Sequence, residues 1–143
     1  MIPVSTAARG SPMASQTAHS PLIALLTGLA GFLVWAVPSL LDDMRDRPFR
    51  IVEAWDTTLY WAAGLPAMIV VSALVGALCG SRTWRVPLWL LAGHGLAMVL
   101  VHPAGTSLSL LPLTLALIGL VLYPLLWLAA FAGMWLGRVT VGR

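Results

Sequence analysis

Long apolar runs separated by short polar segments form the main pattern of this chain. The apolar runs lie at about 21–41, 57–79, 87–102 and 112–136. A helix of ~20 apolar residues, rising ~1.5 Å per residue, spans a hydrocarbon core of ~30 Å, so runs of this length are typical of membrane helices. The pattern therefore predicts an all-α integral membrane protein with four transmembrane helices at these positions.

The predicted domain organisation follows from these runs. Residues 1–20 mix Ser, Thr, Ala, Pro and Gly without a periodic apolar face, and we expect a flexible N-terminal tail. A single four-helix membrane domain should cover 21–138, with a C-terminal tail at 139–143. The first run is 21 residues long, whereas the apolar part of a signal peptide has ~7–15, so we expect a retained anchor.

Proline, glycine and a cap residue mark the expected ends and bends of the helices. We expect Pro38 to kink or end the first span, Gly64-Leu65-Pro66 to bend the second, and Pro124 to kink the last. Asp56 precedes the second run and suits a helix N-cap. The run at 87–102 has only 16 residues, so it crosses a bilayer only if flanking side chains snorkel or the bilayer thins.

Composition agrees with a membrane location. Of 143 residues, 59% are hydrophobic and 9% charged, against about 25% charged in soluble domains. The segment 42–56 holds eight of the 13 formally charged side chains, including all five acids. It could be a docking or ion-collecting surface, but mixed charges of this kind are typical of a solvated loop. The basic residues form no patch with interleaved aromatics, so we expect no nucleic-acid partner.

The arginine distribution predicts the orientation. Four crossings put both tails and the turn at 81–86 on one side of the membrane, and this side carries Arg9, Arg82, Arg85, Arg138 and Arg143. The opposite side carries Arg45, Arg47 and Arg50 together with the five acids. Basic residues concentrate on the cytoplasmic side of membrane proteins. We therefore expect a multi-pass protein of the bacterial inner (cytoplasmic) membrane with both termini in the cytoplasm.

Small residues recur at every fourth position in the second and last spans. Such small-xxx-small stripes allow a second helix backbone to approach closely, although chance matches are common in helices rich in Gly and Ala. We expect these positions to pack helices together: Ser72, Gly76 and Gly80 in the second span, and Ala129, Gly133 and Gly137 in the last.

Two histidines form the candidate intramembrane polar site. His94 lies near the centre of the third run and His102 at its end; a separation of eight residues puts them about 80° apart around a helix. One interpretation is a neutral His94 hydrogen-bonded to a carbonyl freed by a kink at Pro66 or Pro124. The other is a ligand-contacting or proton-handling residue that lines a wet cavity.

No familiar catalytic or cofactor motif is present in the sequence. There is no CxxC, HExxH, P-loop, GxGxxG or nucleophile elbow. Cys79 is the only cysteine, which leaves no intramolecular disulfide or Cys-rich metal site. A haem b needs axial histidines from different helices, and His94 and His102 share one. We expect no catalytic residue, no metal and no cofactor.

Several short motifs resemble a group of small four-helix bacterial inner-membrane proteins. They are Tyr60-Trp61 with Gly64-Leu65-Pro66, then Trp84-Arg85-Val86-Pro87-Leu88, Gly93, and the stretch Leu108–Leu113 that ends in Leu-Pro-Leu. The similarity covers about 55–137. The resemblance implies the membrane location and the number of helices, and it implies no activity.

These observations favour a non-catalytic integral membrane protein that packs with itself or serves as an accessory subunit of a membrane complex. Membrane lipid is the other expected partner. The alternative is a small transporter or channel component with His94 lining a path. An enzyme that handles a quinone or a lipid is a third possibility, since its chemistry need not be visible in motifs.

Overall fold

The computed structural model describes residues 20–46, 54–101 and 111–141, and nearly all of them are helical. The long helices are α1 (Ser20–Asp46), α2 (Leu65–Cys79), α3 (Val86–Leu100) and α4 (Leu111–Val141). Three short helical segments accompany them: η2 (Ala54–Asp56), η3 (Tyr60–Gly64) and η4 (Gly80–Arg85). The predicted all-helical fold with four long helices is confirmed for this part of the chain.

Three of the helices have the length and composition to cross a membrane. The spans are Pro21–Leu41, Tyr60–Cys79 and Pro112–Thr140, with 21, 20 and 29 residues. The second span joins η3 and α2. The fourth helix, α3, has 15 residues, which gives it a length of about 22 Å. It is therefore shorter than a hydrocarbon core of ~30 Å.

The helices extend beyond several of the predicted ends. α1 continues through Pro38 to Asp46, because a proline removes only one backbone N–H and the turn is reinforced by the Ser39 hydroxyl, which donates to the Trp35 carbonyl at 3.0 Å. α4 reaches Val141, so part of the segment expected as a C-terminal tail is helical. Of the flexible tail predicted at 1–20, Ser20 belongs to α1. Residues 1–19, most of the loop after Asp46, and His102 lie outside the described residues.

The cap of the second span is Thr57 and not Asp56. The Thr57 hydroxyl accepts a hydrogen bond from the Tyr60 backbone N–H at 3.1 Å and donates one to the Ala54 carbonyl at 2.6 Å. Asp56 is exposed. At this position, a threonine hydroxyl accepts a hydrogen bond from a free N–H of the first turn and donates its own proton to a carbonyl of the preceding segment. An ionised carboxylate can only accept, so it cannot make the second bond.

A π-helical turn precedes the proline of the second span, where a bend was expected. Over η3, the helix widens so that the Leu65 N–H donates to the Tyr60 carbonyl. Pro66 lacks the N–H that would continue the normal ladder, and a wider turn re-pairs the backbone around it. The result turns the Tyr60 side chain into the core, where only 3% of it is exposed.

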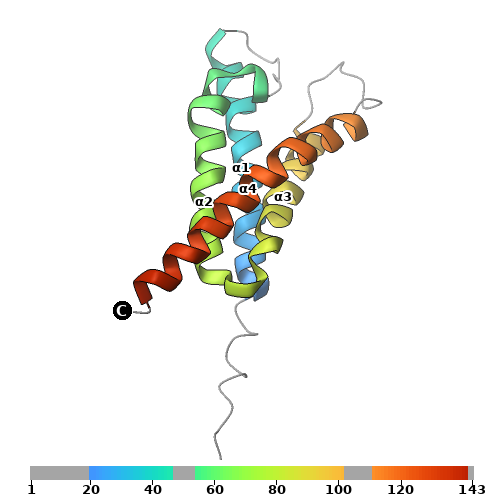
Figure 1. Ribbon diagram of the computed structural model, residues 1–143. Coiled ribbons are helices and arrows are strands. Elements are labelled where there is room, and N and C mark those ends of the chain that lie inside the picture. Colours follow the sequence, from blue (N-terminus) through green and yellow to red (C-terminus); the bar gives the residue numbers. More distant parts are fainter. Residues whose placement is uncertain (1–19, 47–53, 102–110, 142–143) are drawn as a thin grey trace, which may run out of the picture.

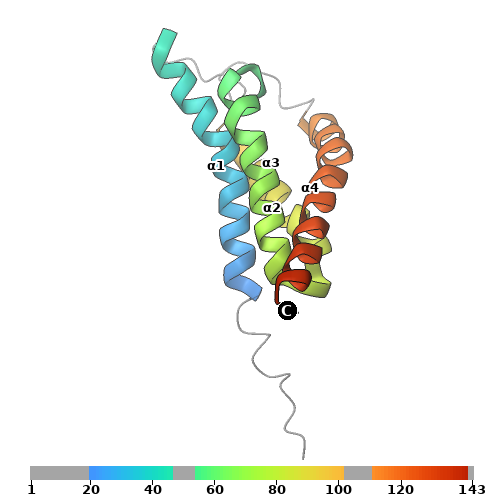
Figure 2. The same ribbon diagram turned by 60° about the vertical axis from the view of Figure 1, so that its left-hand side comes forward.

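The four helices form a bundle made of two closely packed pairs. α1 packs mainly on α3, and α2 mainly on α4. Figure 1 shows that α1 and α3 run in one direction and that α2 and α4 run in the other, with α4 crossing the bundle diagonally. The start of α1, the segment η4 and the end of α4 lie at the same end of the bundle in both views (Figures 1 and 2).

The core consists of two clusters of buried side chains. One contains Trp35, Ala36, Ala54, Tyr60, Ala97 and Met98. The other contains Met68, Val86, Leu90, Leu122, Leu126 and Ala130. The outer faces of α1, α2 and α4 carry large exposed apolar side chains, among them Leu78 and Leu120, which are 74% and 73% exposed. An apolar exterior of this extent suits a lipid environment or a protein interface.

Candidate functional site

His94 lies in the interior of the bundle, enclosed by aromatic rings. It is on α3 and only 1% of it is exposed. Its ring centroid is 5.1 Å from that of Trp35 on α1 and 5.9 Å from that of Tyr60 on η3. Three separate elements therefore converge on one imidazole.

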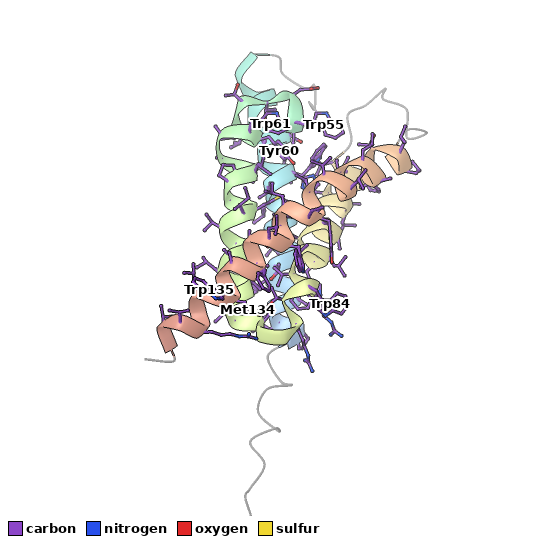
Figure 3. All side chains as sticks on the ribbon, viewed as in Figure 1. Trp55, Tyr60, Trp61, Trp84, Met134 and Trp135 are labelled. Carbon is purple, nitrogen blue, oxygen red and sulfur yellow. The ribbon has the colours of Figure 1, made fainter. Side chains whose placement is uncertain are left out.

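The rings around His94 continue into a larger group, which we call the aromatic cluster (Trp35, Trp55, Tyr60, Trp61 and His94). Trp35 meets Trp55 edge-on at 5.2 Å and Tyr60 at 6.1 Å, and Tyr60 meets Trp61 at 5.4 Å. Edge-to-face pairs of this kind add about 0.5–1.5 kcal/mol each beyond the area they bury. Figure 3 shows Trp55, Tyr60 and Trp61 together at one end of the bundle.

Local backbone structure assembles the cluster. The Thr57 cap fixes the start of the second span, and the π-turn directs Tyr60 inward. The Trp61 indole N–H donates to the Trp55 carbonyl at 2.6 Å, which holds η2 against the helix. As a result, the half-buried Trp55 covers the buried Trp35.

The buried nitrogens of this cluster lack hydrogen-bond partners. Within the described part of the chain, neither Nδ1 nor Nε2 of His94 is paired, and Nε1 of Trp35 is also unpaired. The hydrogen bond required by the first interpretation, from His94 to a carbonyl freed near Pro66 or Pro124, is not formed. The rings of Trp35 and Tyr60 occupy the sides of the imidazole, and the π-turn has re-paired the Tyr60 carbonyl with a backbone N–H.

The chemistry available at His94 is that of a neutral polar site. In the described segments, no group of three or more His, Cys, Asp or Glu side chains lies together. The hydrophobic core cluster beside it consists of aromatic, aliphatic and methionine side chains, none of them charged. The imidazole and the indole can therefore donate or accept hydrogen bonds, and no described neighbour supplies a charge to them.

Most of the predicted packing residues lie where α2 meets α4. A Cβ added to Gly76 would overlap the carbonyl of Ala130, and one added to Gly133 would overlap the carbonyl of Ala73. The Ser72 hydroxyl donates across the same interface to the Leu126 carbonyl at 2.7 Å. Glycine is required at Gly76 and Gly133 because the two backbones touch there.

The remaining predicted packing residues differ in their surroundings. Gly137 faces Ala77 at ordinary contact distance. Ala129 is half-buried, and the adjacent Ala130 is the alanine that meets Gly76. Gly80 makes no such contact, because it ends α2 with a φ of +54° and a Cβ there would find nothing within 4 Å. Its role is conformational, since a positive φ favours glycine.

A second backbone contact, between α1 and α3, is not identified by the four-residue rule. A Cβ on Gly31 would overlap the Leu90 carbonyl, and one on Gly93 would overlap the Gly28 carbonyl. Both interfaces use a three-residue spacing on each helix: Gly28 and Gly31 against Leu90 and Gly93, and Ala73 and Gly76 against Ala130 and Gly133. A search for glycine three residues after any apolar residue would have included these positions among many others.

The exposed face of α4 carries a second feature absent from the sequence-based predictions, which we call the aromatic ridge (Trp127, Phe131 and Trp135). Their exposed fractions are 38%, 47% and 59%. Trp127 and Phe131 stack with ring centroids 5.6 Å apart and an interplanar angle of 22°. Their spacing of four residues places them on one helix face, and this spacing was visible in the sequence.

Comparison with known proteins gives no further guide to the site. The chain matches no protein-family model, no curated protein and no solved structure, so its resemblance to the small inner-membrane proteins stays a prediction.

Proposed function

We propose that this chain is a non-catalytic integral membrane protein that packs with a second copy of itself or serves as an accessory subunit of a membrane complex. The observation that carries the proposal is the aromatic ridge on α4. Trp127 and Phe131 are stacked on an exposed surface, near the middle of the span Pro112–Thr140. Tryptophan in membrane proteins concentrates at the water interfaces, so a tryptophan in the middle of a span needs another explanation. A protein partner offers one, because aromatic residues are enriched at protein interfaces.

The small residues of α2 and α4 are used for contacts within the chain, which leaves the aromatic ridge as the candidate surface for a partner. Gly76 and Gly133 meet partners within the chain, so their contacts stabilise the bundle itself. The exposed faces of α1 and α2 are rich in leucine and valine, which are also compatible with lipid tails. The aromatic ridge is therefore the surface that best fits a protein partner.

A photo-crosslinking experiment tests the partner. With a benzoylphenylalanine at Phe131, ultraviolet light should give a discrete protein adduct in native membranes, because this side chain lies on the ridge. An adduct of twice the chain mass indicates self-association, and an adduct identified as another membrane protein indicates an accessory subunit. The matched control places the same probe at Leu74, which is 63% exposed on α2, and should give lipid adducts only.

The outcome at Phe131 decides the proposal. Lipid adducts alone at this position, as at Leu74, would show that the ridge faces lipid and would remove the support for a docked partner. Trp127→Leu should reduce the yield of the protein adduct without changing the lipid adducts.

The proposed arrangement in the membrane is four crossings with both termini in the cytoplasm. Figure 3 shows Trp55 and Trp61 toward one end of the bundle and Trp84 and Trp135 toward the other, in keeping with interfacial aromatic belts. The second end also carries the exposed Arg82, Arg85 and Arg138. The Arg85 guanidinium lies 5.1 Å from the Trp84 ring centroid. Arginine and tryptophan beside the short α3 fit side chains that reach the headgroups.

Labelling of single cysteines tests this orientation. In a Cys79→Ser background, Asp56→Cys on the exposed η2 should react with an impermeant maleimide on intact spheroplasts. Thr140→Cys near the end of α4 should react only after lysis, because we place it in the cytoplasm. The reverse pattern would invert the orientation, and equal labelling of both sites in intact spheroplasts would contradict an odd number of crossings between them.

A small transporter or channel component remains the second candidate function. The observation that favours it is the pair of unpaired ring nitrogens on His94. A polar group without a partner in a membrane interior is more often kept for function than for stability. The enclosure of His94 by Trp35 and Tyr60 places this candidate second, since a path would require these rings to move.

A further inference from the structure

The unpaired nitrogens of the aromatic cluster are hydrogen-bond donors and an acceptor without partners. A neutral imidazole carries one N–H donor and one bare acceptor nitrogen, and an indole carries one donor. Trp35 and His94 therefore present two donors and one acceptor, on side chains that are only 2% and 1% exposed. Leaving such groups unsatisfied is unfavourable, because they lose their hydrogen bonds to water and gain none in return.

The Trp35 and His94 rings are neighbours that share no direct hydrogen bond. Their centroids lie 5.1 Å apart in an edge-to-face arrangement with planes inclined at 73°, and no hydrogen bond joins the Trp35 Nε1 to either His94 nitrogen. Neighbouring polar groups that are not bonded to each other can be linked by one oxygen atom that bonds to both. Such an oxygen accepts from the indole N–H and either donates to the bare imidazole nitrogen or accepts from the imidazole N–H.

The surroundings restrict the guest to a neutral molecule. The hydrophobic residues that form and border this part of the core belong to α1, η2, η3, α3 and α4, and none of them carries a charge. The described acid Asp56 is exposed, and no described ion pair or charged side chain belongs to the cluster. A charged guest would lose its hydration without gaining a countercharge, which is strongly unfavourable. A hydroxyl group avoids this cost and supplies both a lone pair and a proton.

We propose that Trp35 and His94 form a binding site for one neutral hydroxyl oxygen, which bridges the indole N–H and an imidazole nitrogen between α1 and α3. The hydroxyl belongs to a water molecule or to a small membrane-soluble alcohol or phenol. This inference rests on the contacts of the aromatic cluster and does not depend on the proposed accessory function.

Nuclear magnetic resonance on the full chain in detergent tests the proposal. The protein is labelled with nitrogen-15 in its tryptophan and histidine rings, and Trp35→Phe assigns the Trp35 indole signal. We expect this proton at the downfield shift of a hydrogen-bonded indole, with a cross-peak to a proton of the guest. His94→Phe keeps a ring of similar size and removes both nitrogens, so the cross-peak should disappear.

The source of the hydroxyl is read from the same spectra. A cross-peak at the water resonance identifies water. A cross-peak to other protons, together with a compound in the organic extract of the parent that is missing from the extract of His94→Phe, identifies a membrane-soluble alcohol or phenol.

Two further measurements keep the test decisive. Trp135→Phe removes an exposed indole on α4 and should leave the Trp35 signal unchanged. If His94→Phe does not fold, His94→Gln replaces it, and the parent spectrum alone still decides. A Trp35 indole proton at an upfield shift without a guest cross-peak would overturn the proposal, because it would show the N–H resting on the face of a neighbouring ring.

Discussion

Replacing Gly93 with alanine should lower the free energy of unfolding by about 3 kcal/mol, the upper part of the usual range for an overpacked core. The added Cβ would occupy the position of the Gly28 carbonyl. Because the obstacle is backbone and not the end of a flexible side chain, α1 and α3 must move apart along their whole contact. Unfolding in mixed micelles with increasing SDS, followed by circular dichroism, measures the change.

A matched control is available on α4. Gly119 lies in a helix, and a Cβ there would meet nothing within 4 Å. Gly119→Ala should therefore leave stability unchanged or raise it slightly, since alanine favours a helix by up to about 1 kcal/mol over glycine. Gly133→Ala should behave like Gly93→Ala, because it meets the Ala73 carbonyl. Equal stability of Gly93→Ala and Gly119→Ala would contradict the backbone contact.

Trp35→Ala should also destabilise the protein, by about 3–5 kcal/mol, as is typical when a buried large aromatic is truncated. Trp35 is 2% exposed and touches Trp55, Tyr60 and His94. Its removal leaves a cavity and ends three ring contacts. The same SDS titration measures the loss.

The control for this change is Trp135→Ala, which removes the same side chain from an exposed position. Trp135 is 59% exposed, so its truncation leaves no cavity and should change stability by less than about 1 kcal/mol. If the two variants unfold at the same SDS fraction, the aromatic cluster is not a centre of stability. In that case, burial of Trp35 would not be what holds η2 and η3 in place.

Local sequence features predicted the helices well and their contacts less well. The apolar runs gave all four helices, because a long run of apolar residues needs no tertiary partner to be recognised. The cap was placed one residue early, since Asp56 and Thr57 are both good cap residues and only the backbone path selects between them. Pro66 indicated an irregularity, yet the linear pattern did not show that a π-turn resolves it and turns Tyr60 into the core.

The candidate site was predicted in part. His94 was identified as a buried polar residue from its place in an apolar run, and the structure gives it 1% exposure. Its neighbours Trp35 and Tyr60 lie 59 and 34 positions earlier in the numbering. No spacing rule connects residues so far apart. The lack of a hydrogen-bond partner could be seen only once these rings were placed around it.

The sequence by itself determined that this chain is helical, where most of its helices begin, and which few polar groups lie among apolar residues. These properties depend on hydrophobicity and on local backbone chemistry, which act within a few turns. Only the tertiary structure decided that Gly31 and Gly93 bring α1 and α3 together, and that Gly76 and Gly133 do so for α2 and α4. Apolar helix faces resemble one another in hydrophobicity, so their pairing depends on steric fit between backbones, which a linear pattern does not contain.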